Sequence, residues 1–218
     1  MIVIAGVFSQ SEVAAARAVA AGLVFADGRA TAGRIAKQVK ANDQAAASPE
    51  RDAILEKAKK AILAHPVFAS AARPRSMTPL ILSRYRVGQT YGLHVDDALM
   101  QGMRTDLSFT LFLSDPDTYV GGALEVEDNF APREVKLEAG DLILYPSTTL
   151  HRVTPVESGE RLAIVGWVES WIRGAAERDI LFDLDQALAA IEAAEGKSAV
   201  YDKVAKSRSN LLRLWAGL

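Results

Sequence analysis

Residues 107–113 read Leu-Ser-Phe-Thr-Leu-Phe-Leu. Leucine or phenylalanine stands at every second position, and Ser108, Thr110 and Phe112 occupy the positions between. A period of two is typical of a β-strand, because successive side chains of a strand point to opposite faces of the sheet. The stretch therefore predicts a strand.

More short runs rich in branched and aromatic residues surround this stretch, separated by Gly, Pro, Asp and Ser. They cover residues 80–86, 123–127, 133–137, 141–145 and 162–168. Many short strands at such spacing are typical of an antiparallel sandwich or barrel, and a jelly roll is among the candidates. The middle of the chain is therefore predicted to be a β-domain.

The N-terminal flank predicts a strand followed by helices. The apolar run at residues 1–8 favours a strand, and Ser9 then precedes Glu12 by three positions, the spacing of a capping box. A helix is expected from there to about Gly22. A second helix begins at Ser48, with Ile54, Ala58, Ile62 and Leu63 at helical spacing, and ends at His65 because Pro66 disfavours helical geometry before it.

The C-terminal flank predicts two more helices. Ile180, Leu184, Leu188 and Ile191 form one apolar stripe, and a second runs through residues 200–215. Packing on the outside of the barrel is the simpler use for these stripes, and a homo-oligomer interface is the alternative. The expected fold is mainly β with flanking helices: an N-terminal α/β segment (1–77) packing on the barrel, a jelly-roll core (78–172) and a C-terminal helical extension (173–218).

Composition excludes several function classes. The 218 residues carry 25 Lys and Arg against 27 Asp and Glu, a near-balance that argues against nucleic-acid or membrane binding. With no cysteine, disulfide scaffolds, thiolate metal sites and cysteine nucleophiles are impossible. The N-terminus lacks the basic region of a signal peptide, and no stretch approaches the roughly 18 apolar residues of a spanning helix. We expect a cytoplasmic location.

Two of the three histidines are candidate metal ligands. His65 is expected only to cap its helix. His94 and Asp96 are two positions apart, so in a strand both side chains leave the same face, whereas on a helix they would diverge. His151 follows the strand at 141–145 and a turn-rich segment. Two histidines and one carboxylate are the facial triad of non-haem iron(II) oxygenases. A zinc site that activates water for hydrolysis is the alternative.

Arg161 separates these alternatives. It lies ten positions after His151, at the start of a strand. If its side chain points inward, Ala163, Val165 and Trp167 point inward as well, and a guanidinium then lies in an apolar cavity near the metal. A buried arginine needs an anionic partner, and a bidentate carboxylate ligand supplies one. The alternative is an exposed arginine paired with Glu157 or Glu160.

The sequence resembles the 2-oxoglutarate- and Fe(II)-dependent dioxygenases, in particular the bacterial PKHD-type hydroxylases, relatives of the prolyl and lysyl hydroxylases. The resemblance covers nearly the whole chain. It is carried by residues 85–96, 119–122, 140–151 and 159–167, and by flanking motifs at 27–33 and 210–215. One departure is Ala123, where relatives often have Glu.

The resemblance implies a double-stranded β-helix, the jelly-roll barrel of this family. It implies that His94, Asp96 and His151 hold Fe(II) and that Arg161 binds the distal carboxylate of 2-oxoglutarate. Tyr85 or Tyr91 would add a phenol hydrogen bond to the co-substrate, with structural packing as the alternative for both. The implied reaction hydroxylates a substrate and releases succinate and CO2, and L-ascorbate is expected as a rescuing reductant.

Two other functions compete with this one. The first is a zinc-dependent hydrolase or isomerase on the same barrel, and the second is a non-catalytic module that binds iron or 2-oxoglutarate. A jelly roll alone does not discriminate between them. The substrate, a small molecule or a peptide, is not encoded by any readable motif. Loops at residues 98–105 and 114–120, together with the N-terminal helices, are expected to select it.

Overall fold

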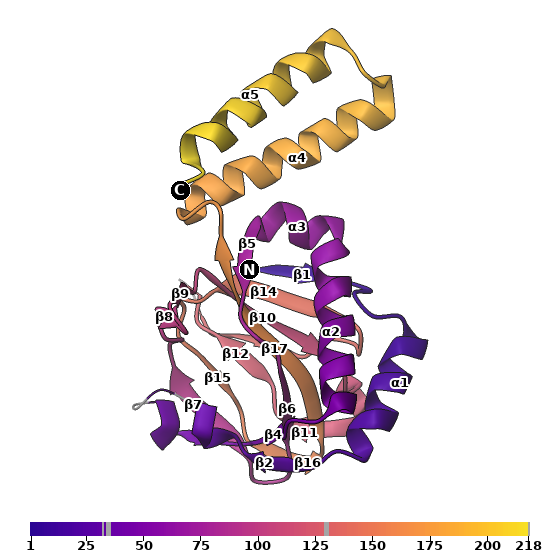
Figure 1. Ribbon diagram of the computed structural model, residues 1–218, viewed down its shortest axis with the longest axis vertical. Helices are drawn as coiled ribbons and strands as arrows, with labels where there is room; N and C mark the ends of the chain where they lie inside the picture. The colour runs from indigo at the N-terminus through magenta and orange to yellow at the C-terminus, as the bar shows by residue number, and fades with distance from the viewer. Residues whose placement is uncertain (32, 34–35, 129–130, 218) are drawn as a thin grey trace.

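The computed structural model describes residues 1–31, 33, 36–128 and 131–217, and two antiparallel sheets form its centre (Figure 1). Ala32 of the 27–33 motif lies outside the described residues. Within these residues the larger sheet has eight strands. Seven of them follow one another in the order β1 (Ile2–Ile4), β14 (Leu142–Pro146), β10 (Leu107–Phe112), β17 (Arg161–Ser170), β6 (Ile81–Tyr85), β4 (Asp43–Ala45) and β2 (Phe25–Asp27), and β5 (Pro74–Met77) pairs with β17.

The smaller sheet carries most of the remaining strands. Its order is β13 (Arg133–Val135), β12 (Leu124–Val126), β15 (His151–Val153), β7 (Thr90–His94) and β3 (Lys40–Ala41). Two short pairs complete the β-structure: β11 (Tyr119–Gly121) with β16 (Val156–Gly159), and β8 (Leu99–Met100) with β9 (Met103–Arg104). The chain is mainly β with flanking helices, as expected, and the two sheets form a jelly roll.

The N-terminal segment belongs to both sheets. It supplies β1, β2, β4 and β5 to the larger sheet and β3 to the smaller one. Between β3 and β4 the chain crosses from one sheet to the other at Asn42, whose side-chain amide donates to Ser83 Oγ at 2.7 Å. Short 3-10 turns precede this crossing at Gly28–Thr31 and Ala36–Gln38, and another lies at Pro116–Thr118.

Strand β10 has both faces buried, and its polar face is the inner one. Phe109 and Leu111 pack into the apolar cluster under the helices, while Ser108 and Thr110 line a cavity between the sheets. The period of two in residues 107–113 therefore separates a helix-covered face from a polar interior.

The helix boundaries follow the capping residues. Helix α1 (Gln10–Ala21) begins after Ser9, and the predicted capping box with Glu12 is formed. Helix α2 (Pro49–Ala64) begins after Ser48, whose side chain accepts from the backbone N–H of Arg51, and ends at His65. These features confirm the expectations, except that Leu63 is exposed and does not share the buried face of α2.

One helix was not expected. Pro66 ends α2 but also opens α3 (Pro66–Ala72), because proline at the first position of a helix lacks only a hydrogen bond that this position would not make. His65 lies at the junction, where its backbone N–H donates to the carbonyl of Ile62. Its imidazole caps no helix, and its Nδ1 has no hydrogen-bond partner among the described residues.

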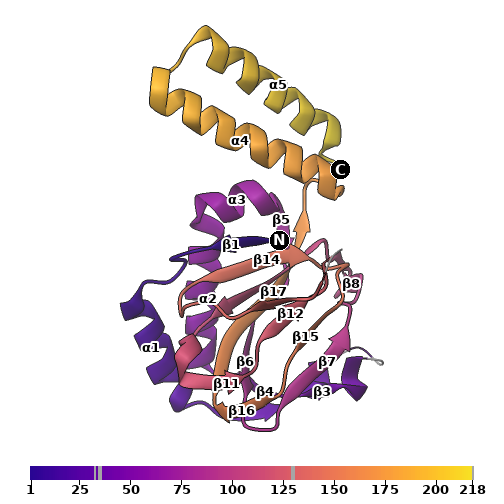
Figure 2. The same ribbon diagram turned by 180° about the vertical axis from the view of Figure 1, so that it is seen from behind.

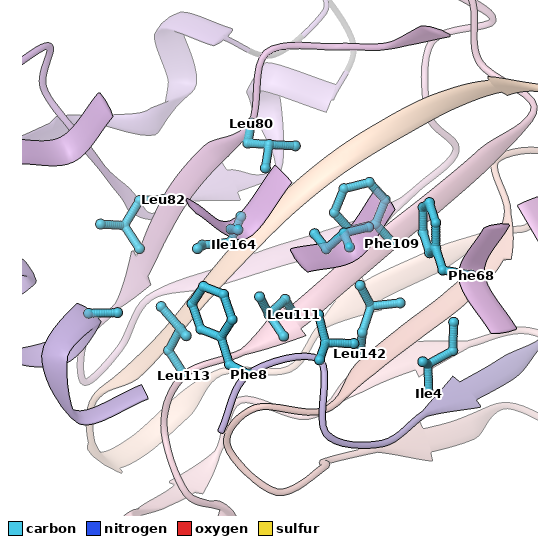
Figure 3. Packing of buried hydrophobic residues seen from close by; sticks show 14 of the residues in the cluster. Ile4, Phe8, Phe68, Leu80, Leu82, Phe109, Leu111, Leu113, Leu142 and Ile164 are labelled. Carbon is cyan, nitrogen blue, oxygen red and sulfur yellow. The ribbon is translucent and has the colours of Figure 1, made fainter. Parts of the chain in front are cut away.

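The main core lies between the larger sheet and the helices α1 to α3. Side chains from β10, β14 and β17 converge there on those of α3 and the N-terminal segment (Figure 3). Phe68 of α3 meets Phe109 edge to face, with ring centroids 5.7 Å apart. This core fixes β10 and β17, two of the strands that line the cavity.

The C-terminal helices form a hairpin that projects away from the barrel (Figures 1 and 2). Helix α4 (Ala175–Glu195) buries only its first turns, at Arg178 and Leu181, and α5 (Ala199–Trp215) packs along α4 with no fully buried residue. The two helices therefore pack on each other and not along the outside of the barrel as expected, and Ile180, Val200 and Leu214 of the predicted stripes are exposed. None of the described helices is long and apolar enough to span a membrane.

Candidate metal centre

The strand register brings the two candidate histidines together. His94 ends β7 and His151 begins β15, and the two are cross-strand partners with ring centroids 4.2 Å apart. Opposite residues of paired strands present their side chains on the same face. Asp96 lies beyond the end of β7 and so is not in the strand, contrary to the expectation, yet its carboxylate reaches the same place.

The three side chains offer ligand atoms that lie within 4.8 Å of one another. His151 Nε2 is 3.7 Å from Asp96 Oδ2. Both histidines and the aspartate have largely buried side chains. Two imidazole nitrogens and one carboxylate on one side of a point suit a divalent transition metal and leave the opposite side open for other ligands.

Backbone carbonyls fix which nitrogen of each ring faces the site. His94 Nδ1 lies 2.8 Å from the carbonyl oxygen of Gly92, and His151 Nδ1 lies 2.9 Å from that of Thr149. A carbonyl oxygen only accepts, so each Nδ1 carries the hydrogen and each Nε2 presents a lone pair. This outer hydrogen bond is the usual one for a metal-binding histidine.

A serine pair orients the carboxylate. Ser108 Oγ donates to Asp96 Oδ2 at 2.6 Å, and the hydroxyl of Ser147 lies 2.8 Å from that of Ser108. Since the single hydrogen of Ser108 goes to Asp96, Ser147 donates to Ser108. The polar face of β10 thus holds Asp96 in place.

Burial keeps His94 neutral. Desolvation, helped by the neighbouring His151, lowers the pKa of His94 to about 4. The neutral imidazole is the form that binds a metal. The ring of Tyr91 stacks on that of His94, with centroids 3.6 Å apart.

All six candidate residues line a single cavity between the two sheets: His94, Asp96, His151, Arg161, Tyr85 and Tyr91. His94 and Asp96 also line an outer groove, whose rim carries the exposed side chains of Val39, Leu93 and Leu150. The candidate metal centre therefore lies where the inner cavity meets the groove.

Arg161 is buried in this cavity with no carboxylate partner among the described residues. Its side chain is 1% exposed, and its guanidinium carbon lies 5.3 Å from the ring centroid of Tyr85 and 5.2 Å from that of Phe112. Glu160, the alternative partner, instead lies 3.8 Å from Arg84. Arg161 Nε has no hydrogen-bond partner in the described part of the chain. A buried guanidinium that lacks a carboxylate partner in the described part of the chain is suited to binding a ligand carboxylate through two parallel hydrogen bonds.

The tyrosines around the cavity are neutral hydrogen-bonding groups. Burial raises the pKa of Tyr85, Tyr91 and Tyr145 above the usual value, and the nearby charge of Arg161 opposes this effect on Tyr85 and Tyr145. The ring of Tyr145 lies edge-on to His151, with centroids 5.1 Å apart. Each phenol therefore keeps its hydrogen at neutral pH.

Sequence reasoning missed Ser108, Ser147 and Lys40 of the cavity and its surroundings. The sequence offered one signal for Ser108, a serine between apolar residues of a strand. Polar side chains on the inner face of a barrel strand indicate a cavity that binds a polar group. Of the loops expected to select substrate, Ala98 and Thr105 line the outer groove, whereas residues 114–120 contribute to a separate surface pocket through Ser114 and Thr118.

Comparison with known proteins shows the family to which the chain belongs. Residues 80–169 match the 2OG-Fe(II) oxygenase superfamily, and residues 176–217 match the PKHD-type hydroxylase C-terminal domain. The chain is 50% identical over 192 residues to a PKHD-type hydroxylase of Maricaulis maris, covering 88% of each chain. It is 51% identical over 191 residues to one of Parvibaculum lavamentivorans, covering 88% of this chain and 87% of the relative.

Solved structures show the same fold. A Pseudomonas putida prolyl-4-hydroxylase superposes with a TM-score of 0.54 at 19% identity, over 78% of this chain and 91% of that one. A viral collagen prolyl hydroxylase from Paramecium bursaria Chlorella virus-1, in its 2OG complex, superposes with a TM-score of 0.53 at 19% identity. The match covers 78% of this chain and 94% of that one.

Proposed function

Since the chain belongs to the PKHD-type hydroxylases, we propose that it is an Fe(II)- and 2-oxoglutarate-dependent dioxygenase that hydroxylates a substrate and releases succinate and CO2. The observation that carries this proposal is the joint placement of His94, Asp96 and His151, with ligand atoms within 4.8 Å, in one cavity with the buried Arg161. A zinc hydrolase acting on a neutral substrate would have no use for that guanidinium.

His94, Asp96 and His151 would hold the ferrous ion. The two neutral imidazoles donate lone pairs, and Asp96 adds the negative charge that they lack. Bound there, Fe(II) would supply the activation of dioxygen that couples decarboxylation of 2-oxoglutarate to hydroxylation of the substrate. Ser108 and Ser147 keep the carboxylate oriented, and the carbonyls of Gly92 and Thr149 keep the rings oriented.

Arg161 would bind the distal carboxylate of 2-oxoglutarate. The apolar surroundings of its guanidinium, which include Phe112, exclude competing water and strengthen the ion pair. Tyr85 lies beside Arg161 and can donate to the same carboxylate, while Tyr91 packs on His94 and positions that ring. Co-substrate bound in this way spans the cavity from Arg161 to the metal.

The substrate, a small molecule or a peptide, would enter through the outer groove that His94 and Asp96 line. Stimulation by L-ascorbate, a homo-oligomeric state and a cytoplasmic location stay predictions, as does the absence of nucleic-acid and membrane partners.

Anaerobic binding of 2-oxoglutarate to the Fe(II)-loaded protein tests this function. Chelation of Fe(II) by a 2-oxo acid gives a weak visible charge-transfer band, so the band can be titrated with 2-oxoglutarate. In Arg161→Ala we expect the Kd for 2-oxoglutarate to rise by at least about 100-fold, because a buried carboxylate loses its charged partner. The same variant should release correspondingly less succinate in air.

Arg152→Ala is the matched control. Arg152 is the residue after His151, but it is half exposed and pairs with Glu125 on the outer face. Its removal should leave the Kd for 2-oxoglutarate within about twofold, since exposed ion pairs contribute little. A wild-type protein without the band, or an Arg161→Ala variant that binds 2-oxoglutarate normally, would overturn the proposal.

A further inference from the structure

A second buried cation, Lys40, lines the same cavity and has no role in the function proposed above. It lies on β3, the edge strand of the smaller sheet, directly opposite Tyr91 of β7. Its ammonium is 5.0 Å from the ring centroid of Tyr91, the residue that stacks on His94. One aromatic ring therefore separates Lys40 from a candidate metal ligand.

The ammonium of Lys40 is incompletely partnered. Among the described residues, Nζ makes one hydrogen bond, to Thr31 Oγ1 at 3.2 Å, and Asp96 and Asp27 act on it only through longer-range electrostatic attraction. An ammonium has three N–H donors, so two remain available. Burial lowers the pKa of Lys40 to about 8, yet the side chain is still mostly protonated at neutral pH.

A second donor without a partner faces the same cavity from the opposite sheet. Trp167 lines the cavity, and its indole N–H is buried with no acceptor in the described part of the chain. Trp167 pairs across the sheet with Ser108, which holds Asp96, so it lies at the metal end. Arg161 lies six residues back along β17, at the start of the strand and on the same cavity-lining face.

We propose that Lys40 binds a carboxylate of the substrate that is to be hydroxylated, with the indole N–H of Trp167 as a second donor. The inference rests on the proposed function, in which Arg161 is committed to the co-substrate at the deep end of β17. Lys40 and Trp167 are at the metal end, where the reacting C–H group of a substrate must lie.

A single carboxylate fits this end of the cavity better than a phosphate. Lys40 is the one cation besides Arg161 among the described residues that line the cavity. One ammonium balances one negative charge, whereas a phosphate monoester carries nearly two at neutral pH. Asp97 also lines the cavity and disfavours a further negative charge.

Binding of matched acids and amides tests the proposal without knowledge of the natural substrate. The protein is loaded with Zn(II) and 2-oxoglutarate, and benzoate, benzamide, N-acetyl-L-alanine and N-acetyl-L-alaninamide are titrated by calorimetry. We expect each acid to bind at least tenfold more tightly than its amide. Lys40→Met should abolish this preference, and Lys40→Arg should retain part of it.

Lys37→Met is the matched control, because Lys37 is exposed on the same N-terminal segment. It should bind the acids as the wild type does, and both Lys→Met variants should bind 2-oxoglutarate with wild-type affinity. Equal binding of acid and amide, no binding of either acid, or a preference that survives in Lys40→Met overturns the inference.

Two results distinguish a failure of this inference from a failure of the proposed function on which it rests. A Zn(II)-loaded wild type that fails to bind 2-oxoglutarate contradicts the proposed function itself. A Lys40→Met variant that loses 2-oxoglutarate binding, while the wild type keeps it, assigns Lys40 to the co-substrate and contradicts only the proposal for the substrate.

Discussion

The hydroxyl of Ser108 holds the only carboxylate among the three candidate ligands. Its hydrogen bond to Asp96 Oδ2, at 2.6 Å, is charge-assisted and is itself supported by Ser147. Asp96 lies beyond the end of β7, so its side chain depends on this contact more than a strand residue would. Removal of the Ser108 hydroxyl should therefore weaken metal binding.

We predict that Ser108→Ala weakens Fe(II) binding by about 10- to 100-fold, the usual cost of removing a partner that orients a ligand. Equilibrium dialysis with Fe(II) under anaerobic conditions measures the effect. Ser114→Ala is the control, because Ser114 is also buried and hydrogen-bonded, to the backbone of Glu160 and Leu162. Equal iron affinities of these two variants would disprove the role of Ser108.

Lys40 should make stability depend on pH. Burial lowers its pKa from 10.5 to about 8, so the folded state binds the proton less tightly than the unfolded state. The penalty is fully present below about pH 8 and disappears as the pH rises toward the unfolded value. Lys40→Met should accordingly stabilise the metal-free protein at pH 7 by about 1–3 kcal/mol.

Urea unfolding between pH 7 and pH 10 measures this difference. The gain of Lys40→Met over the wild type should shrink steadily across that range. For Lys37→Met, whose parent lysine is exposed, the difference from the wild type should stay flat. A gain in Lys40→Met that does not change with pH would show that Lys40 is not destabilised by burial.

Residue types and spacing predicted the proximity of His94, Asp96 and His151, because a metal site needs few ligand types and this chain has only three histidines. Their roles, and that of Arg161, stay predictions. Lys40 could not be found in this way. A lysine in a polar segment is usually exposed, and only the pairing of β3 with β7 places this one inside.

At the scale of elements, the positions of the strands were easier to predict than which face of each strand points into the cavity. The run at 107–113 predicted β10, but both of its faces are buried, and the pattern alone does not tell which one borders a cavity. Helix α3 was missed because Pro66 was treated only as a stop. Proline ends one helix and suits the first position of the next equally well.

Asp185 carries the charged contacts that help attach the α4–α5 hairpin to the rest of the molecule. Asp185 of α4 pairs with Arg73, at 2.6 Å, and with Arg208 of α5, at 2.8 Å, and it also accepts from Ser70 of α3. Arg73 is buried, so its loss of a charged partner would be costly. This cluster ties the two helices to each other and to α3.

We predict that Asp185→Asn destabilises the hairpin locally by about 1–3 kcal/mol, since charged hydrogen bonds contribute more than neutral ones. Hydrogen–deuterium exchange should become faster in α5 while β10 and β17 stay protected. Asp202→Asn, which removes an exposed pair with Lys197, is the control. Unchanged exchange in α5 would show that apolar packing alone holds the hairpin.

At the scale of the whole molecule, the barrel is completed by a segment that lies far away in the sequence. Residues 40–45 join the edges of both sheets, and β1 extends the larger sheet beside β14. Short strands of two or three residues carry too little pattern to be predicted, because their partners, and not their own sequence, make them strands. The jelly-roll class was predicted, whereas this closure was not.

The most direct test of the account is the binding of ferrous ion to the wild type and to Asp96→Ala under anaerobic conditions. The wild type should bind one Fe(II) per chain, and 2-oxoglutarate should then develop the charge-transfer band. Asp96→Ala should lose tight binding, because two neutral imidazoles offset the metal charge poorly. A wild type that binds no iron, or an Asp96→Ala variant that binds it as tightly, would contradict the account.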